Sequence, residues 1–136
     1  MADRSVELFA ALRTALAGDA TLTTVLGGSS RVHSAMAPAG APPPYVVIGD
    51  ETAADYGASD GDSQEHTVTM HVWTEEPGKL KCLQAMSAVR AALHDVALAL
   101  SGGLLVNLRC EFKETFRDPD GVSQHGVMRF RAVTTG

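Results

Sequence analysis

The stretch that most limits what this chain can fold into is 79–95, KLKCLQAMSAVRAALHD. Its apolar residues recur at intervals of three and four, which places them on one side of an α-helix with 3.6 residues per turn. They are Cys82, Leu83, Met86, Val89 and Leu93, and Val96 continues the spacing directly after the stretch. Most of the other residues also favour the helix intrinsically. The stretch therefore predicts a helix with one broad apolar face, and that face needs a sheet to cover it.

The segments on both sides of this helix have the pattern of strands. Before it, two helices are predicted, at 5–17 and just after Asp19, followed by strands at 31–34, 45–48 and 65–73. After it come a strand at 104–113, a turn at 117–121 and a return strand through 128–132. The order ααβββαββ predicts one α+β domain over residues 1–136, with an antiparallel sheet of four or five strands and helices packed on one face.

Alternation along the last two strands predicts which side chains face the helices. The inward set is Leu104, Val106, Leu108, Cys110, Phe112, Met128, Phe130 and Ala132. The outward set contains four cations, Arg109, Lys113, Arg129 and Arg131, and Glu111 is expected beside Arg129 across the hairpin. We interpret this basic face either as a solvated surface with cross-strand ion pairs or as a docking surface for an acidic segment. DNA binding is disfavoured because the patch is small and carboxylates dilute it.

Charge is distributed unevenly along the chain. No lysine or arginine occurs over 32–78, whereas eight aspartates and glutamates do, most of them in the glycine-rich stretch 49–65. This stretch is predicted to be a long loop or a projecting hairpin that extends the neighbouring strands. The separation of charges suits a molecule that meets copies of itself with opposite charges facing each other.

Sequence patterns for catalysis and metal binding lack the context that those activities need. Residues 57–61 match G-x-S-x-G but lie in the acidic stretch, without the parallel strand and following helix of a nucleophile elbow. Asp60, Asp62 and Glu65 lack an EF-hand frame, and the five histidines have no zinc-ligand spacing. A small hydrolase using His71, His125 and nearby acids is the alternative from another class of protein, although no constellation supports it. We expect no cofactor and no metal.

The two cysteines and the hydropathy of the chain bear on its surroundings. Cys82 and Cys110 both fall at apolar positions, which is typical of reduced core residues in a cytosolic product. No apolar run approaches the roughly 20 residues that span a bilayer, and the N-terminal residues do not resemble a signal peptide. We therefore expect no membrane partner.

An ordered set of motifs resembles a known family. The motifs are PYVVIG at 44–49, EH at 65–66 with HVW at 71–73, VRAALH at 89–94, RCE at 109–111, DPDG at 118–121 and HGVMRFRA at 125–132. Together they resemble the small tail-terminator, or tail-completion, proteins of long-tailed phages and of the gene transfer agents of alphaproteobacteria. The likeness covers nearly the whole chain, and the order of the motifs is more specific than any one of them.

The resemblance implies a non-enzymatic virion or gene-transfer-agent protein, assembled in the bacterial cytoplasm and placed at the head–tail junction. It implies a ring, expected to be a hexamer, that ends the tail tube and contacts the tail tube protein and a head-side stopper or connector. A head stopper or adaptor ring of the same particle remains the alternative.

Unlike charged patches on one subunit suit a heterologous contact that closes into such a ring. The predicted interface residues are Glu51, Asp55, Tyr56, Glu65, Arg109, Arg129 and Arg131. Asp60 and Asp62 are predicted to line a central hole through which DNA passes without specific binding.

Overall fold

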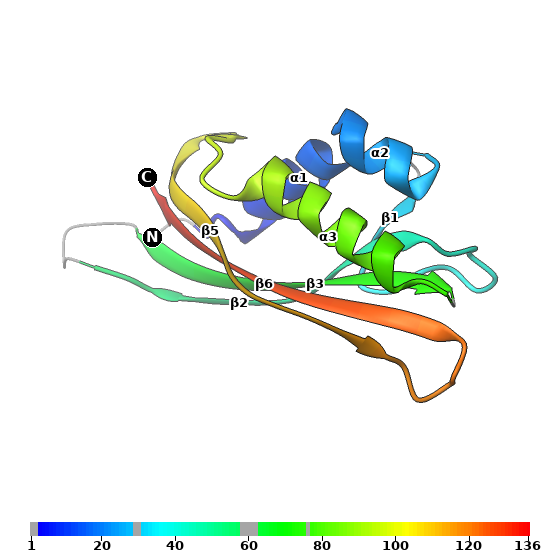
Figure 1. Cartoon of the computed structure of the whole chain (residues 1–136). Helices are drawn as coiled ribbons and strands as arrows, with labels where there is room; N and C mark the ends of the chain where they lie inside the picture. The colour runs from blue at the N-terminus through cyan, green and yellow to red at the C-terminus, as the bar shows by residue number, and fades with distance from the viewer. Residues whose placement is uncertain (1–2, 29–30, 58–62, 76) are drawn as a thin grey trace.

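The computed structural model describes residues 3–28, 31–57, 63–75 and 77–136, and these build a sheet with three helices on one face (Figure 1). The helices are α1 (Ser5–Ala17), α2 (Ala20–Leu26) and α3 (Lys79–Leu93). The Asp19 side chain caps α2 by accepting a hydrogen bond from the backbone N–H of Leu22 at 2.9 Å, and Gly27 ends it with φ +90°. The predicted positions of the three helices are therefore confirmed.

The sheet has six strands in the order β1-β2-β3-β6-β5-β4. Their bounds are β1 (Val32–Ser34), β2 (Tyr45–Asp55), β3 (Gln64–Glu75), β4 (Ala99–Leu100), β5 (Gly103–Arg117) and β6 (Ser123–Thr135). The α+β class is confirmed, but the expected four or five antiparallel strands are corrected in two respects. The two-residue strand β4 is added beside β5, and β1 runs parallel to β2. Neither strand is long enough to carry a clear periodic pattern.

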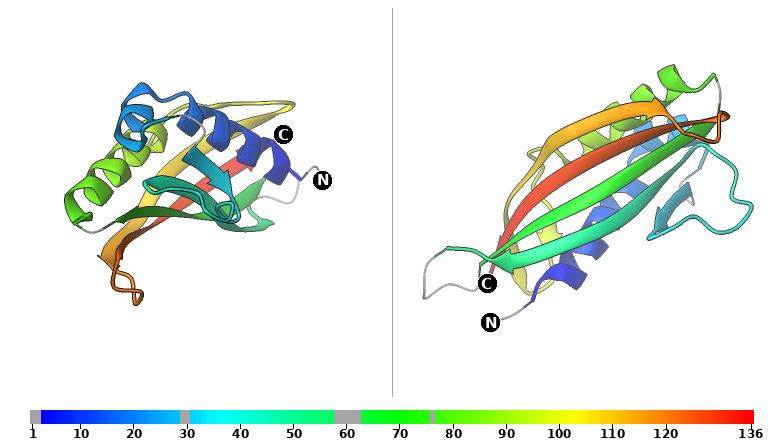
Figure 2. Two further views of the ribbon diagram at one scale, coloured as in Figure 1. Left: turned by 90° about the vertical axis from the view of Figure 1, so that its right-hand side faces the viewer. Right: turned by 90° about the horizontal axis from the view of Figure 1, so that it is seen from below.

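The acidic stretch forms the end of a hairpin in its described part. Strand β2 continues past Ile48 to Asp55 and pairs with β3 down to Gln64, so both arms extend beyond the apolar segments that the sequence marks as strands. A register shift between Ile48 and Glu51 changes which side chains of β2 face the helices. The end of β2 and the start of β3 lie at the same end of the molecule as both chain termini (Figure 1; Figure 2, right).

The core lies between α1, α3 and the inner face of the sheet. Its fully buried members include Leu8, Leu12 and Leu16 of α1, Met86 and Val89 of α3, and Met70, Val72, Met128 and Phe130 of the central strands. Leu83 is 39% exposed at the rim, so it does not belong to the buried stripe of α3 as predicted. None of the described helices is both long enough and apolar enough to cross a membrane.

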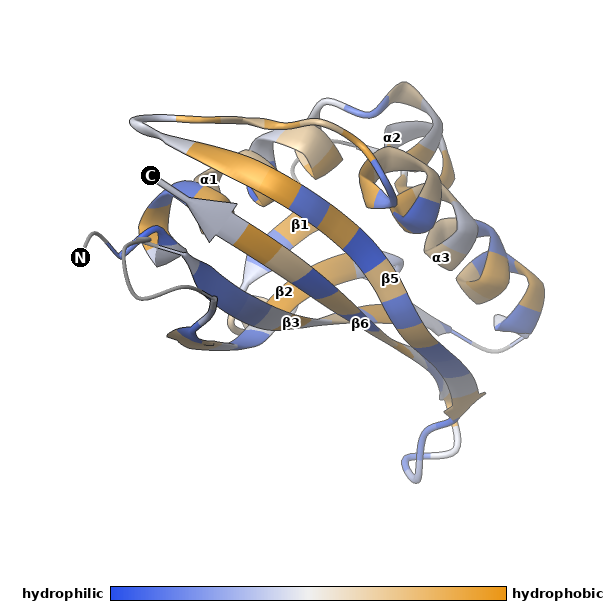
Figure 3. Cartoon of the chain, turned by 90° about the vertical axis from the view of Figure 1, so that its left-hand side faces the viewer, coloured by the Kyte–Doolittle hydropathy of each residue, from blue (hydrophilic) through white to orange (hydrophobic). Residues whose placement is uncertain are grey.

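Two irregularities in β5 overturn part of the predicted alternation. Register shifts between Leu105 and Asn107, and between Cys110 and Phe112, each insert one extra residue relative to β6. Only the middle of the strand keeps the predicted inward direction, at Leu108 and Cys110. Leu104, Val106 and Phe112 are instead 63%, 55% and 40% exposed. The strand's mixed hydropathy along its length is visible in Figure 3.

The same shifts change the neighbours of two charged residues. Lys113 pairs with Met128 of the inner face and so leaves the predicted basic face. Glu111 was predicted to lie beside Arg129, but it falls inside the second bulge. Phe112 lies opposite Arg129 instead.

Arg4 ties together the end of the molecule where the termini lie. Its backbone N–H donates to the Gln64 side-chain oxygen at 2.9 Å, and its guanidinium donates to the carbonyl of Gly136 at 2.5 Å. The guanidinium also pairs with Glu7 at 2.8 Å. Arg4 therefore contacts Gln64 at the start of β3, Glu7 of α1 and the last residue, Gly136.

Candidate assembly interface

The helix-free face of the sheet, which we call the outer face, is the candidate functional surface. Seen from below, the four long strands lie side by side with no helix in front of them (Figure 2, right). Strand pairing places Arg109, Arg129 and Arg131 together on this face, as predicted, because β6 alternates without a break and Arg131 lies opposite Arg109. The outer face therefore combines cations with the exposed apolar side chains of β5.

Three of the predicted interface residues meet within one chain. The Arg131 guanidinium donates a short hydrogen bond to the Glu65 carboxylate on the neighbouring strand β3. The Cζ atom of Arg131 also lies 5.3 Å from the centre of the Tyr56 ring, which is a cation–π contact. The hydrogen bond that the guanidinium donates to Glu65 is the main cause that raises the pKa of Arg131. These contacts connect Glu65 of β3 and Tyr56, which follows β2, to Arg131 of β6.

Arg109 and Arg129 have weaker partners. Arg109 pairs with Asp95 at 3.2 Å, but both side chains are about half exposed, and pairs of this kind contribute little to stability. The Arg129 guanidinium lies over the Phe112 ring, with its Cζ atom 5.0 Å from the ring centre. Among the described residues no carboxylate forms an ion pair with Arg129.

The acidic residues of the hairpin fall in different environments. Asp55 is exposed near the end of β2 and has no ion pair with any described residue. Glu51 is partly buried and lies opposite the inner-face residue Val68 in the strand register. The Glu51 carboxylate lies 3.2 Å from Nδ1 of His66, and Nε2 of that ring lies 2.9 Å from the Thr134 hydroxyl. Asp60 and Asp62 lie outside the described residues, so their predicted lumen position stays a prediction.

The order carboxylate, imidazole, hydroxyl at Glu51, His66 and Thr134 is that of a hydrolase relay, but its position excludes this use. His66 and Thr134 are both 0% exposed, so no substrate reaches the hydroxyl. The contacts instead satisfy buried polar groups where the hairpin joins the core. Sequence reasoning missed this cluster, because its members are far apart in the chain and only strand register brings them together.

A second histidine cluster lies on the outer face at the opposite end from the termini. Nδ1 of His71 is 2.8 Å from Nε2 of His125, and Trp73 stacks on His125 with ring centres 3.8 Å apart. Desolvation is the main cause that lowers the pKa of both imidazoles, and the neighbouring His71 also lowers that of His125. The sequence named both histidines, but it could not show that they touch. Alternation along β3 places His71 and Trp73 on one face, and the register with β6 then places His125 opposite Trp73.

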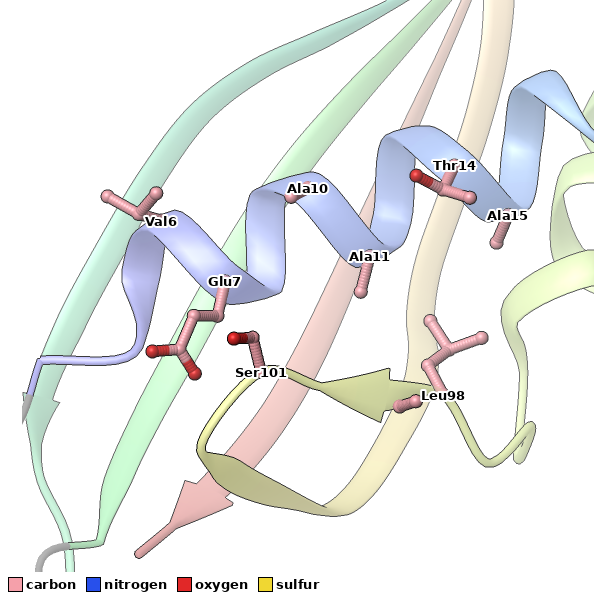
Figure 4. Close-up of a pocket in the computed structure, with 9 residues that line it drawn as sticks. Val6, Glu7, Ala10, Ala11, Thr14, Ala15, Leu98 and Ser101 are labelled. Atoms are coloured by element: carbon pink, nitrogen blue, oxygen red, sulfur yellow. The ribbon is translucent and has the colours of Figure 1, made fainter.

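Grooves on the surface carry little chemistry. The histidine cluster and residues of the 35–44 segment line one groove of about 420 Å³. Another, of about 590 Å³, runs between α1 and the residues around Leu98 (Figure 4) and is lined largely by alanines. Its Glu7 already pairs with Arg4. Within the described ranges, no group of three or more histidine, cysteine or acidic side chains could hold a metal ion.

The described part of the chain is thus a helix-backed sheet with one bare, charged face, and its class of protein comes from comparison with known proteins. The model of the family described as tail completion protein gp17 matches residues 10–135. The chain belongs to this family, which confirms the resemblance predicted from its motifs.

Individual relatives give the same result. The tail completion protein gp17 of Bacillus phage SPP1 is 29% identical over 90 residues, which is 66% of each chain. A chain in the virion of a native gene transfer agent particle matches with a TM-score of 0.89, 29% identity and full coverage of both chains. The structure of the SPP1 gp17 protein matches with a TM-score of 0.56 at 23% identity, covering 97% of this chain and 95% of that one, and shares the fold. The predictions of a structural, non-enzymatic protein of phage-type particles are thereby confirmed.

Proposed function

We propose that this chain completes the tail of a phage-type particle as a ring of six copies. The ring ends the tail tube and joins it to the head-side stopper or connector. Two findings support the proposal: the SPP1 relative is named a tail completion protein, and a chain of the same fold and length belongs to a gene transfer agent particle. The structural feature that carries it is the bare outer face, where Arg129 lacks a carboxylate partner among the described residues.

In this proposal the acidic hairpin of one subunit contacts the outer face of the next. The two patches differ, so the contact is heterologous, and a suitable rotation closes it into a ring. Asp55 is the natural partner for Arg129 of the neighbour, because each is accessible and neither pairs with a described charge. The other predicted interface residues contribute to the subunit contact, either by extending it or by fixing the hairpin that makes it. They are Glu51, Tyr56, Glu65, Arg109 and Arg131.

Apolar contacts supply most of the affinity, and charge sets register and encounter rate. Leu104 and Val106, both more than half exposed on β5, are suited to burial against a neighbour. Asp60 and Asp62, further along the hairpin, line the central hole, where negative walls let DNA pass without binding.

A charge swap tests the pairing of hairpin and outer face. Arg129→Glu should convert the ring to smaller species, because it places two carboxylates against each other, and Asp55→Arg should do the same. The double variant should recover the ring, as measured by solution mass at low and high salt. Lys81→Glu, a change of the same charge on the exposed side of α3, is the matched control and should leave the mass unchanged.

Two outcomes separate the parts of the proposal. A ring that survives Arg129→Glu and Asp55→Arg at both salt concentrations would show that the pairing is wrong while the ring stands. A wild-type chain that stays monomeric with tail tube subunits present, and does not limit tube length, would rule out the ring itself.

A further inference from the structure

The His71–His125 cluster has a geometry that the assembly role does not use. Both rings are half-buried, and the 2.8 Å contact between Nδ1 of His71 and Nε2 of His125 is a hydrogen bond between two imidazoles. Trp73 stacks almost parallel on His125, at an angle of 14°, and Phe116 packs with its ring centre 5.0 Å from that of His125. The rings form the floor of the groove bordered by residues 35–41.

The hydrogen bond between the rings constrains where protons can go. In the neutral pair one of the two facing nitrogens carries a hydrogen and the other accepts it. The donor ring then has a free nitrogen on its far side. A first proton can bind there, and the hydrogen bond remains and becomes charge-assisted. A second proton must take the accepting nitrogen, which removes the acceptor and sets two positive charges side by side.

The charged side chains around the pair are acidic. Asp50 of β2 and Asp118 of the β5–β6 turn act on His71 and His125 respectively and favour protonation, but neither makes a hydrogen bond to its ring among the described residues. Glu75 at the end of β3 and Glu114 of β5 are exposed on neighbouring register positions. Tyr45 lines the groove, and His33 packs edge-on against it. The 35–44 segment contains no ionisable side chain.

We propose that His71 and His125 form a two-proton latch on the outer face. The pair keeps its hydrogen bond when it takes up one proton. It separates when it takes up the second, which moves the His125 ring off Trp73 and reshapes the floor of the groove. The two protons bind as coupled steps that belong to the pair and not to either ring alone. The latch does not depend on the ring proposed above.

Nuclear magnetic resonance of the imidazole nitrogens during acidification tests this latch in the full chain. The wild type should show two separated protonation steps shared by His71 and His125. Trp73 stacks on His125 with ring centres 3.8 Å apart, so its ring current shifts the His125 protons and reports the stack. That ring-current shift should persist through the first step and disappear at the second.

Variants distinguish a coupled pair from two independent histidines. His71→Gln leaves His125 with a neutral hydrogen-bond partner, so His125 should titrate in a single step and stay stacked on Trp73 throughout. His33→Gln is the matched control and should keep both steps. Independent single steps in the wild type, unchanged in His71→Gln, would overturn the latch. Loss of the far-ultraviolet circular dichroism signal together with the second step would also overturn it, because the second proton would then unfold the whole chain and not only separate the two rings.

Discussion

His66 is a polar side chain buried completely where the acidic hairpin joins the core. A buried imidazole is tolerated only when both ring nitrogens have partners, and here Glu51 and Thr134 supply them at 3.2 and 2.9 Å. Glu51 was predicted from its charge to contact a neighbouring subunit. That role stays a prediction, and within one chain its contact is with His66.

Replacing His66 should therefore destabilise the fold. His66→Leu removes both hydrogen bonds and leaves the Thr134 hydroxyl buried without its partner, at a cost of about 1–3 kcal/mol per unsatisfied group. Urea unfolding followed by circular dichroism measures this. His33→Leu, at a half-buried position of β1, is the control and should change the free energy of unfolding much less. Equal losses in the two variants would show that the His66 contacts contribute nothing.

Among the elements, β5 and β6 show what a sequence pattern can and cannot predict. Strand β6 alternates without interruption, so Arg129 and Arg131 could be placed on the outer face from the sequence. In β5 the same rule fails beyond Leu108 and Cys110, because a bulge depends on pairing with the neighbouring strand and leaves no mark in the residue period. The apolar part of the outer face, Leu104, Val106 and Phe112, was missed for this reason.

Helix α3 packs closely against β6 at Gly126. At Gly126 an added Cβ would lie 2.6 Å from the Met86 sulfur and 3.0 Å from the Cys82 sulfur. Gly126→Ala should therefore cost about 1–3 kcal/mol through overpacking. Met86→Ala alone should also destabilise, by leaving a cavity.

The double variant provides the control for this contact. In Gly126→Ala/Met86→Ala the new methyl group occupies part of the space left by Met86, so the combined loss should be smaller than the sum of the two. Thermal unfolding of the four proteins gives the coupling energy. Additive losses would mean that the residue at 126 does not limit how closely α3 packs.

At the scale of the whole molecule, the sequence could predict the fold class and the family but not the complete surface. Periodicity located the helices, and the ordered motifs carried the resemblance that the family match confirms. The pairing of Arg131 with Glu65 inside one chain, and the contact of His71 with His125, depend on which strands become neighbours and in which register. Such contacts between distant segments are set by tertiary structure alone.

Acid should destabilise the isolated molecule from a pH well above that of ordinary carboxylate titration. The pKa values of His71 and His125 are lowered from 6.5 in the folded chain, so the unfolded chain binds more protons below that pH. Their contribution to stability is present above about pH 6.5 and is lost as the pH falls through the folded pKa values.

Urea unfolding at a series of pH values from 7.5 to 5 checks this sign. The free energy of unfolding should fall more steeply in the wild type than in His71→Gln/His125→Gln. A steeper fall in the double variant would mean that the folded chain favours the charged imidazoles. The carboxyls of Asp3 and Asp120, whose pKa values are lowered mainly by hydrogen bonds from backbone N–H groups, act only at lower pH.

The meeting of both chain ends at Arg4 has a practical consequence for anyone who labels this protein. An affinity tag or fluorescent fusion on either terminus emerges beside the start of β3 in the acidic hairpin (Figure 1), where the adjoining copy is proposed to sit. A label inserted in the exposed turn at 119–121, at the far end of the molecule, leaves that region clear.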